Sequence, residues 1–192
     1  MQTPRRPHLP RTSGPRRLPP RTTGPHPHID QQSPKKGGSL TGPSPVDRGK
    51  LGSKIHVVSD RGGLPLTVAI SAANTHDSLA LKPLVMAIPA VKSRRGPRRR
   101  RPAKLHADKA YDIPALRDWV REQGIAVRIA RKGIESAKKL GQHRWVIERT
   151  MAWLTGYRRL TLRYERKAEH FLAFLQLGSA LSCWKKLRKA ST

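Results

Sequence analysis

Near the middle of this 192-residue chain runs the segment Leu105-His106-Ala107-Asp108-Lys109-Ala110-Tyr111-Asp112. Its short apolar start predicts a β-strand that closes at Asp108, and the residues that follow predict a turn toward a helix. A side chain at the end of a strand has its direction fixed by the sheet. The segment therefore predicts an α/β fold that presents a carboxylate at a strand end.

A second acid, Glu148, lies in the segment His143–Thr150, which has helical character. Mg²⁺ prefers carboxylate oxygens as ligands, and two such ions held about 3.5–4 Å apart can cleave a phosphodiester. Asp108 and Glu148 are therefore predicted to hold metal ions in a nuclease-like catalytic site. An apolar stripe beside Glu148 would dock its helix on the sheet and leave the acid at the edge of a cleft; the stripe consists of Ile147, Met151 and Leu154.

Both acids also have a structural interpretation. Asp108 can cap the turn after its strand, and Glu148 can pair with Arg144, four residues earlier on the same helix face. Asp77 is interpreted as a helix cap. The remaining conspicuous side chains are also interpreted as structural: histidines without metal-site spacing, at His56, His76 and His106, and tryptophans expected in the core, at Trp145, Trp153 and Trp184.

The charge of the chain points to a polyanionic partner. It has 40 Lys and Arg residues against 12 Asp and Glu, a formal net charge of +28. An excess of this size favours nucleic acid through counterion release, although a generally adhesive basic protein or a membrane-surface protein would share it. The single cysteine, Cys183, excludes an internal disulfide and fits a reducing compartment. The longest apolar segment, Phe171–Trp184, is too short to cross a bilayer.

Two parts of the chain differ in composition. Residues 1–50 are rich in Pro, Arg, Gly, Thr and Ser and are predicted to be a disordered basic segment, because they cannot bury enough surface to offset their ordering entropy. Residues 51–192 are predicted to fold as one catalytic domain. Within it we expect strands at 54–59, 64–70, 105–108 and 125–130, and helices at 79–88, 114–123, 143–156 and 168–187.

From Thr41 to Leu187 the chain resembles the transposases of small bacterial insertion sequences, which belong to the DDE superfamily and have an RNase H-like core. Several motifs in the same order carry the resemblance: Thr41-Gly42-Pro43-Ser44-Pro45-Val46-Asp47-Arg48-Gly49-Lys50, Gly52-Ser53-Lys54-Ile55-His56-Val57, Gly63-Leu64-Pro65-Leu66, Asn74-Thr75-His76-Asp77-Ser78, Ala107-Asp108-Lys109-Ala110-Tyr111-Asp112, Arg144-Trp145-Val146-Ile147-Glu148-Arg149-Thr150 and Tyr157-Arg158-Arg159-Leu160.

The resemblance implies that Asp108 is the second acid of the catalytic triad and that Glu148 is its glutamate. Two Mg²⁺ ions would be the cofactors, and DNA, both the ends of the element and its target, would be the partner. Arg144 matches an arginine that steadies the carboxylate or a phosphate. Arg149 and the basic loop Arg98, Arg99, Arg100 and Arg101 are expected to contact DNA, with a solvated loop as the alternative for the last four. A homodimer is left open, and no membrane partner is expected. For a DNA-binding protein of bacteria we expect a cytoplasmic, nucleoid-associated location.

The first acid of the triad has a single counterpart, Asp30, upstream of Lys35-Lys36-Gly37-Gly38. The residues before Asp30 are Pro, Arg, Thr and Gly rather than an apolar strand. The sequence therefore predicts an incomplete RNase H-like fold without its central first strand, from a truncated or frame-disrupted chain. Asp30 is then a third catalytic acid or a chance match. The tyrosine and lysine that often flank the glutamate are also absent, with Gly141 and Thr155 nearest to their positions.

Two functions follow from these observations. The first is a transposase, or a fragment of one, that catalyses Mg²⁺-dependent DNA strand cleavage and transfer at insertion-sequence ends. The alternative is a catalytically dead, basic DNA-binding remnant, which the missing first strand and the net charge of +28 would favour.

Overall fold

The computed structural model describes residues 26–32, 38–45, 48–92, 96–131, 133 and 137–191, with the backbone alone for residues 26–32, 137–144 and 191. Along the chain these residues form β1 (His26–Gln32), β2 (Gly42–Pro43), β3 (Leu51–Ser59), β4 (Pro65–Ala72), α1 (Ser78–Met86), β5 (Lys104–Ala107), the 3₁₀ turn η1 (Lys109–Tyr111), α2 (Pro114–Glu122), β6 (Ala126–Ile129), α3 (Ala137–Thr155), α4 (Arg158–Thr161) and α5 (Ala168–Ser191).

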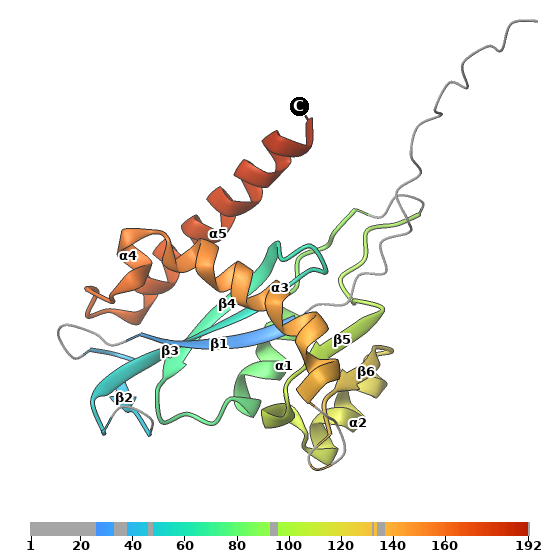
Figure 1. Ribbon diagram of the computed structural model, residues 1–192, viewed down its shortest axis with the longest axis horizontal. Coiled ribbons are helices and arrows are strands. Elements are labelled where there is room, and N and C mark those ends of the chain that lie inside the picture. The colour runs from blue at the N-terminus through green and yellow to red at the C-terminus, as the bar shows by residue number, and fades with distance from the viewer. Residues whose placement is uncertain are drawn as a thin grey trace, which may run out of the picture.

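The strands form an antiparallel group and a parallel pair that meet at β1. Strand β3 pairs antiparallel with β1 on one side and β4 on the other, so that Ile55 lies opposite both Asp30 and Ile70. Strands β5 and β6 are parallel, with Leu105 opposite Val127. Because β1 also lies beside β5, the strands follow the spatial order β4, β3, β1, β5, β6 (Figure 1). This is a mixed α/β arrangement, as the sequence predicts, and it places β1 between the β3–β4 hairpin and β5, the strand that leads to Asp108.

Strand β1 corrects the prediction that the sheet lacks its first strand. Residues 26–32, assigned from their composition to a disordered segment, pair with β3 over seven positions, from His26 opposite Ser59 to Gln32 opposite Ser53. Backbone hydrogen bonds make this pairing, so it does not require the apolar side chains on which the prediction relied. The rest of the segment before residue 38 lies outside the described residues, and the domain boundary near residue 50 stays a prediction.

The other elements match their predicted positions, apart from the two-residue strand β2, which lies in the segment predicted to be disordered, and the differences that follow. Helix α3 begins at Ala137, within the segment expected to be a basic connector, and α5 continues to Ser191. The short helix α4 was not predicted. Asp77 occupies the N-cap position of α1 as expected, but its carboxylate makes no capping hydrogen bond and instead pairs with the Lys54 ammonium at 2.7 Å.

Helices cover both faces of the sheet because successive residues of β3 point to opposite sides. Ile55 and Val57 pack against α3, α4 and α5, in a cluster with Met151, Leu154, Leu160, Phe171 and Leu175. Val58 faces the other way and packs against Leu84 of α1. The apolar stripe predicted on α3 is therefore the face that docks, and it leaves the far side of the helix at the surface (Figure 1).

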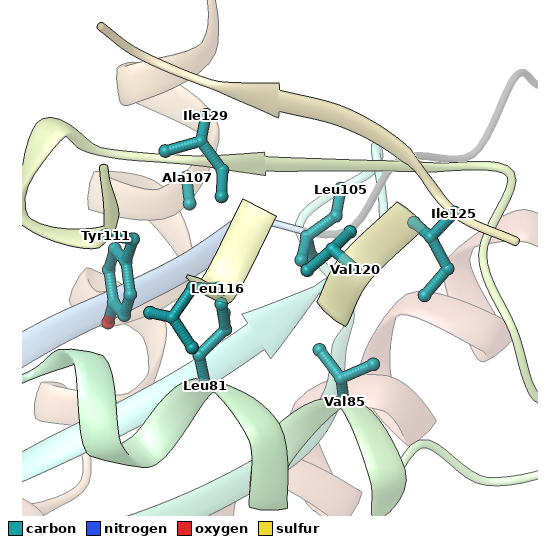
Figure 2. Packing of buried hydrophobic residues seen from close by; sticks show 9 residues of the cluster. All are labelled: Leu81, Val85, Leu105, Ala107, Tyr111, Leu116, Val120, Ile125 and Ile129. Carbon is teal, nitrogen blue, oxygen red and sulfur yellow. The ribbon is translucent and has the colours of Figure 1, made fainter. Parts of the chain in front are cut away.

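A second cluster fixes β5, the strand that leads to Asp108. Figure 2 shows side chains from α1, α2, β5 and β6 converging on one another, with Leu81 and Val85 of α1 below the β5 residues Leu105 and Ala107. Leu105 and Val120 are fully buried. The packing of α1 and α2 against β5 fixes where the next residue, Asp108, leaves the sheet.

A buried arginine joins segments of the chain that lie more than a hundred residues apart in the sequence. The Arg163 side chain is fully buried and donates hydrogen bonds through Nε to Glu165 O (2.9 Å) and through Nη2 to Ser39 O (2.7 Å). Nη1 donates to Leu40 O at 3.3 Å and to the Ser53 hydroxyl of β3. One guanidinium thus ties the segment before β2 to β3 and to the turn before α5.

Replacing Arg163 should destabilise the fold strongly. We expect Arg163→Met to lower the free energy of unfolding by about 3–5 kcal/mol, because the buried carbonyls and hydroxyl that it serves lose their donors, at about 1–3 kcal/mol for each unsatisfied group. Chemical denaturation measures the change. Arg158→Ala, at an exposed position on α4, is the control and should change it by less than about 0.5 kcal/mol; equal effects of the two substitutions would contradict the account.

His56 is a buried ionisable group on β3. Its side chain is 1% exposed, and Nε2 lies 2.7 Å from the Ser71 hydroxyl of β4, whereas Nδ1 has no hydrogen-bond partner among the described residues. Burial lowers the pKa of His56 to about 4, with Asp77 opposing the shift and Lys54 adding to it. The folded protein therefore holds this histidine neutral.

Stability should fall as the pH falls from about 6.5 to about 4. In that window the unfolded chain binds a proton at His56 that the folded chain does not, so the proton favours unfolding. At roughly 1.4 kcal/mol per pKa unit, the loss amounts to about 3 kcal/mol. Denaturation over this pH range should show a flatter slope for His56→Gln than for the parent protein, while His76→Gln, at an exposed position, should retain the parent slope. An unchanged slope in His56→Gln would refute the assignment.

Candidate active site

Asp108 lies where the sequence places it, directly after β5. Its side chain is exposed, and Oδ1 accepts a hydrogen bond of 2.6 Å from the Lys109 N–H at the start of η1. The capping role considered from the sequence is therefore present. The same contact gives the carboxylate a fixed direction at the strand end, which a metal ligand also needs.

Tyr111 closes η1 beneath this acid. Its ring is 1% exposed and belongs to the cluster under β5 (Figure 2). Burial raises the pKa of Tyr111 well above its usual range, and the carboxylates of Asp77 and Asp108 add to the shift. The Tyr111 side chain thus supports the turn by packing, and its neutral hydroxyl is buried without a hydrogen-bond partner among the described residues.

Helix α3, which carries Glu148, is anchored by the turn between β3 and β4. The Thr150 hydroxyl donates to Gly63 O at 2.7 Å, and Nη2 of Arg149 donates to Gly62 O at 2.8 Å. Gly63 has φ +81°, and a Cβ there would lie 3.0 Å from the Thr150 hydroxyl. Only glycine satisfies both conditions without strain, so the Gly63 motif serves to seat α3.

The anchoring contacts determine which way Glu148 faces. Successive residues of an α-helix are about 100° apart around its axis. Ile147 and Met151 are buried against the sheet side, and Arg149 and Thr150 reach the β3–β4 turn. Glu148 is exposed and lies on the flank of α3 away from Thr150. The acid is therefore at the surface, beside the face of α3 that docks on the sheet.

Strand β1 is the element at which the three acid-bearing segments meet. It lies beside β5, which leads to Asp108, and against α3, which carries Glu148 (Figure 1). Asp30 lies on β1 itself, opposite Ile55. The backbone thus brings together the elements of all three predicted acids, whereas the Asp30 side chain is outside the described residues.

The donor set suits a hard divalent cation. Asp108 and Glu148 offer carboxylate oxygens at exposed positions, and neither histidine nor cysteine belongs to the set. Among the residues that the structure describes, no group of three His, Cys, Asp or Glu side chains is close enough to hold a metal ion by itself. A complete site therefore needs Asp30, water or the DNA phosphate as additional ligands.

The predicted DNA-binding arginines fall into two groups. Arg98, Arg99, Arg100 and Arg101 are exposed in a loop closed by two hydrogen bonds of 2.9 Å between the backbones of Val91 and Arg99. This loop leads into the start of β5, so the length of a four-residue strand, roughly 13 Å, separates it from Asp108. Arg149 is half-buried at the β3–β4 turn, and the Arg144 side chain lies outside the described residues.

Two of the three tryptophans expected in the core are at the surface instead. Trp145 is 51% exposed and Trp184 is 58% exposed. Helical spacing alone predicted them to be buried because aromatic residues usually are. The signal that separates them is the position relative to the buried stripe: Ile147, Met151 and Leu154 define that stripe on α3, and Trp145 lies outside it.

Comparison with known proteins shows the family of this chain. Residues 21–183 match the family described as the transposase DDE domain. The chain belongs to this family. It is also 45% identical, over 154 residues that span 80% of the chain and 73% of the relative, to a Burkholderia cepacia protein assigned as the transposase of insertion sequence element IS402.

A solved structure is also similar to this transposase-family chain. The catalytic core domain of BIV integrase covers 80% of the chain, with 80% of its own length covered, at 14% sequence identity and a TM-score of 0.41.

In the part of the chain that the structure describes, no helix has the length and apolarity needed to span a bilayer.

Proposed function

We propose that this protein is a DDE transposase that cleaves DNA strands at the ends of an insertion sequence and joins them to target DNA with the help of divalent metal ions. The observation that carries the proposal is the meeting of β5 and α3 at β1, within a chain whose family is established. The reaction needs a carboxylate at a strand end and another on a docked helix, and both are exposed here. Acting on bacterial DNA, the enzyme would work beside the nucleoid in the cytoplasm.

Asp108 and Glu148 are the proposed metal ligands, and Asp30 is the proposed third acid. When bound, Mg²⁺ would supply charge stabilisation at the reacting phosphate and favour an attacking water or 3′-hydroxyl. The choice of Mg²⁺ rests on the carboxylate oxygens of the donor set. The amide of Lys109 keeps the Asp108 carboxylate in one orientation, and the Thr150 and Arg149 contacts fix the rotation of α3, the helix that carries Glu148.

The basic residues would hold the DNA. Arg98 to Arg101 form an exposed cationic loop that can bind phosphates without reading bases, and Arg144 lies one helical turn before Glu148. With a net charge of +28, association with DNA should be steered over a distance and should weaken steeply as salt concentration rises. The arginines thus account for affinity and the acids for chemistry.

A non-catalytic DNA-binding remnant is the alternative, and its main support has weakened. It relied on the absence of the central strand, whereas β1 occupies that position. The two functions differ in what they require of Asp30: a transposase would need its carboxylate as the third acid, whereas a DNA-binding remnant would not.

Conservative replacement of either acid should abolish cleavage and spare DNA binding. We expect Asp108→Asn and Glu148→Gln each to lower the Mg²⁺-dependent cleavage rate of DNA carrying the element ends at least about 100-fold, as the loss of several kcal/mol of transition-state stabilisation requires. Asp30→Asn should act in the same direction if the third acid is correctly identified. Gel assays of cleaved strands, with binding measured in parallel, give both quantities.

Glu122→Gln provides a matched control, because Glu122 is an exposed acid on α2. It should cleave at the parent rate. Full activity of Asp108→Asn or Glu148→Gln would remove the proposed site. A parent protein that binds DNA but never cleaves it, at any Mg²⁺ or Mn²⁺ concentration, would favour the remnant.

A further inference from the structure

Helix α3 carries a row of aromatic and cationic side chains next to Glu148. The Arg149 guanidinium lies 4.3 Å from the ring centre of Trp145 and 5.1 Å from that of Trp153. The Lys186 ammonium of α5 lies 4.1 Å from the Trp153 ring. Trp145, Arg149 and Trp153 are spaced four apart on α3, so they share one side of the helix.

The Trp145 ring is held in place but is not covered. Arg149, which stacks on it, is itself pinned to Gly62 O by a hydrogen bond of 2.8 Å. With the guanidinium on one face, the ring remains 51% exposed. A large aromatic side chain that is both oriented by a cation and open to solvent has the properties of a binding surface rather than of a core residue.

The position of Trp145 connects it with the acids. It lies three residues before Glu148, about 60° around the helix and roughly 4.5 Å along its axis. Both side chains are exposed on the same flank of α3. Whatever stacks on Trp145 therefore lies within one nucleotide's reach of the Glu148 carboxylate.

A nucleobase is the planar partner that this environment favours. Every base has a π-face that can stack on an aromatic ring irrespective of sequence, and cationic neighbours hold the adjoining phosphates. A second copy of the chain is disfavoured as the partner, because two surfaces of a protein with a net charge of +28 repel each other. A base that is paired inside a duplex cannot offer its face, so the partner must be unpaired.

We propose that Trp145 is a stacking platform for an unpaired DNA base next to Glu148, so that the enzyme holds a strand end or a locally opened duplex at its active site. This inference rests on the proposed function only for the identity of the nucleic acid as DNA. It adds a preference for unpaired over paired DNA that neither the acids nor the phosphate-binding arginines supply. Binding through stacking needs no metal ion and no cleavage.

The test measures binding in EDTA, where cleavage cannot occur. Fluorescence anisotropy compares a fluorescein-labelled oligothymidylate with a fully paired hairpin duplex of equal total charge, at one salt concentration. For the parent protein we expect tighter binding to the single strand. Trp145→Ala should weaken single-strand binding by about 5- to 100-fold, in line with the stacking of a single base, and should leave duplex binding unchanged within about twofold.

Two variants separate stacking from other effects. Trp145→Phe keeps an aromatic face and should recover most of the single-strand affinity. Trp184→Ala removes a tryptophan of similar exposure, 58%, on α5, and should bind both DNAs like the parent. Because Trp145 is exposed, Trp145→Ala should keep the parent melting temperature, which thermal unfolding verifies. An equal loss of single-strand affinity in Trp184→Ala would overturn the assignment to Trp145.

Photocrosslinking gives a direct second readout. An oligothymidylate carrying one 5-iododeoxyuridine should crosslink to Trp145, with the site identified by mass spectrometry of the peptide. Crosslinking confined to other residues, or a Trp145→Ala protein that binds single strands as well as the parent does, overturns the stacking proposal while the cleavage assay still decides the catalytic one. Conversely, a parent protein that binds single strands through Trp145 but never cleaves DNA would contradict the catalytic proposal and still support the stacking proposal.

Discussion

The pairing of β1 with β3 is the constraint on which the rest of the architecture depends. Strand β1 satisfies one edge of β3, lies beside β5 and supports α3. Without β1, β3 would have an unpaired edge, and α3 and β5 would lose the strand that both of them contact. Because Asp108 follows β5, Glu148 lies on α3 and Asp30 lies on β1, the contacts of β1 with β5 and α3 bring the three acid-bearing segments to the same part of the molecule. The chemistry proposed for this transposase-family chain is thus a consequence of a strand that contributes few apolar side chains.

Helix α3 packs into the core with one side and presents candidate functional residues to solvent with the other. Its buried residues, including Met151 and Leu154, join the core under α4 and α5, while its exposed side presents Glu148 and Trp145. Thr150 and Arg149 keep these sides from rotating, since they bond to the carbonyls of the β3–β4 turn. The close approach at Gly63 is what allows those contacts. A rigid, rotationally fixed helix is the support that an acid and a stacking ring need if both are to act on one strand of DNA.

The sequence predicted the parts of this arrangement that leave a periodic or positional signal. Asp108 at a strand end, the docking stripe of α3 and the hairpin of β3 and β4 all follow from apolar patterns, and the family follows from motifs in order. Strand β1 gave no such signal, because its pairing is made by the backbone and its residues include Pro, His, Asp and Gln. The burial of Arg163 and the exposure of Trp145 were also missed. The arginine is buried by partners that lie more than a hundred residues away in the sequence, and burial of a tryptophan depends on which side of a helix docks.

The most direct test of the central claim is anomalous diffraction from crystals of the protein grown with Mn²⁺ as a substitute for Mg²⁺. The account predicts an anomalous peak, or a pair of peaks about 3.5–4 Å apart, with the carboxylate oxygens of both Asp108 and Glu148 in coordination contact with the same ion cluster. Peaks that contact only one of the two residues, or well-ordered carboxylates of residues 108 and 148 too far apart to share ions, would contradict it.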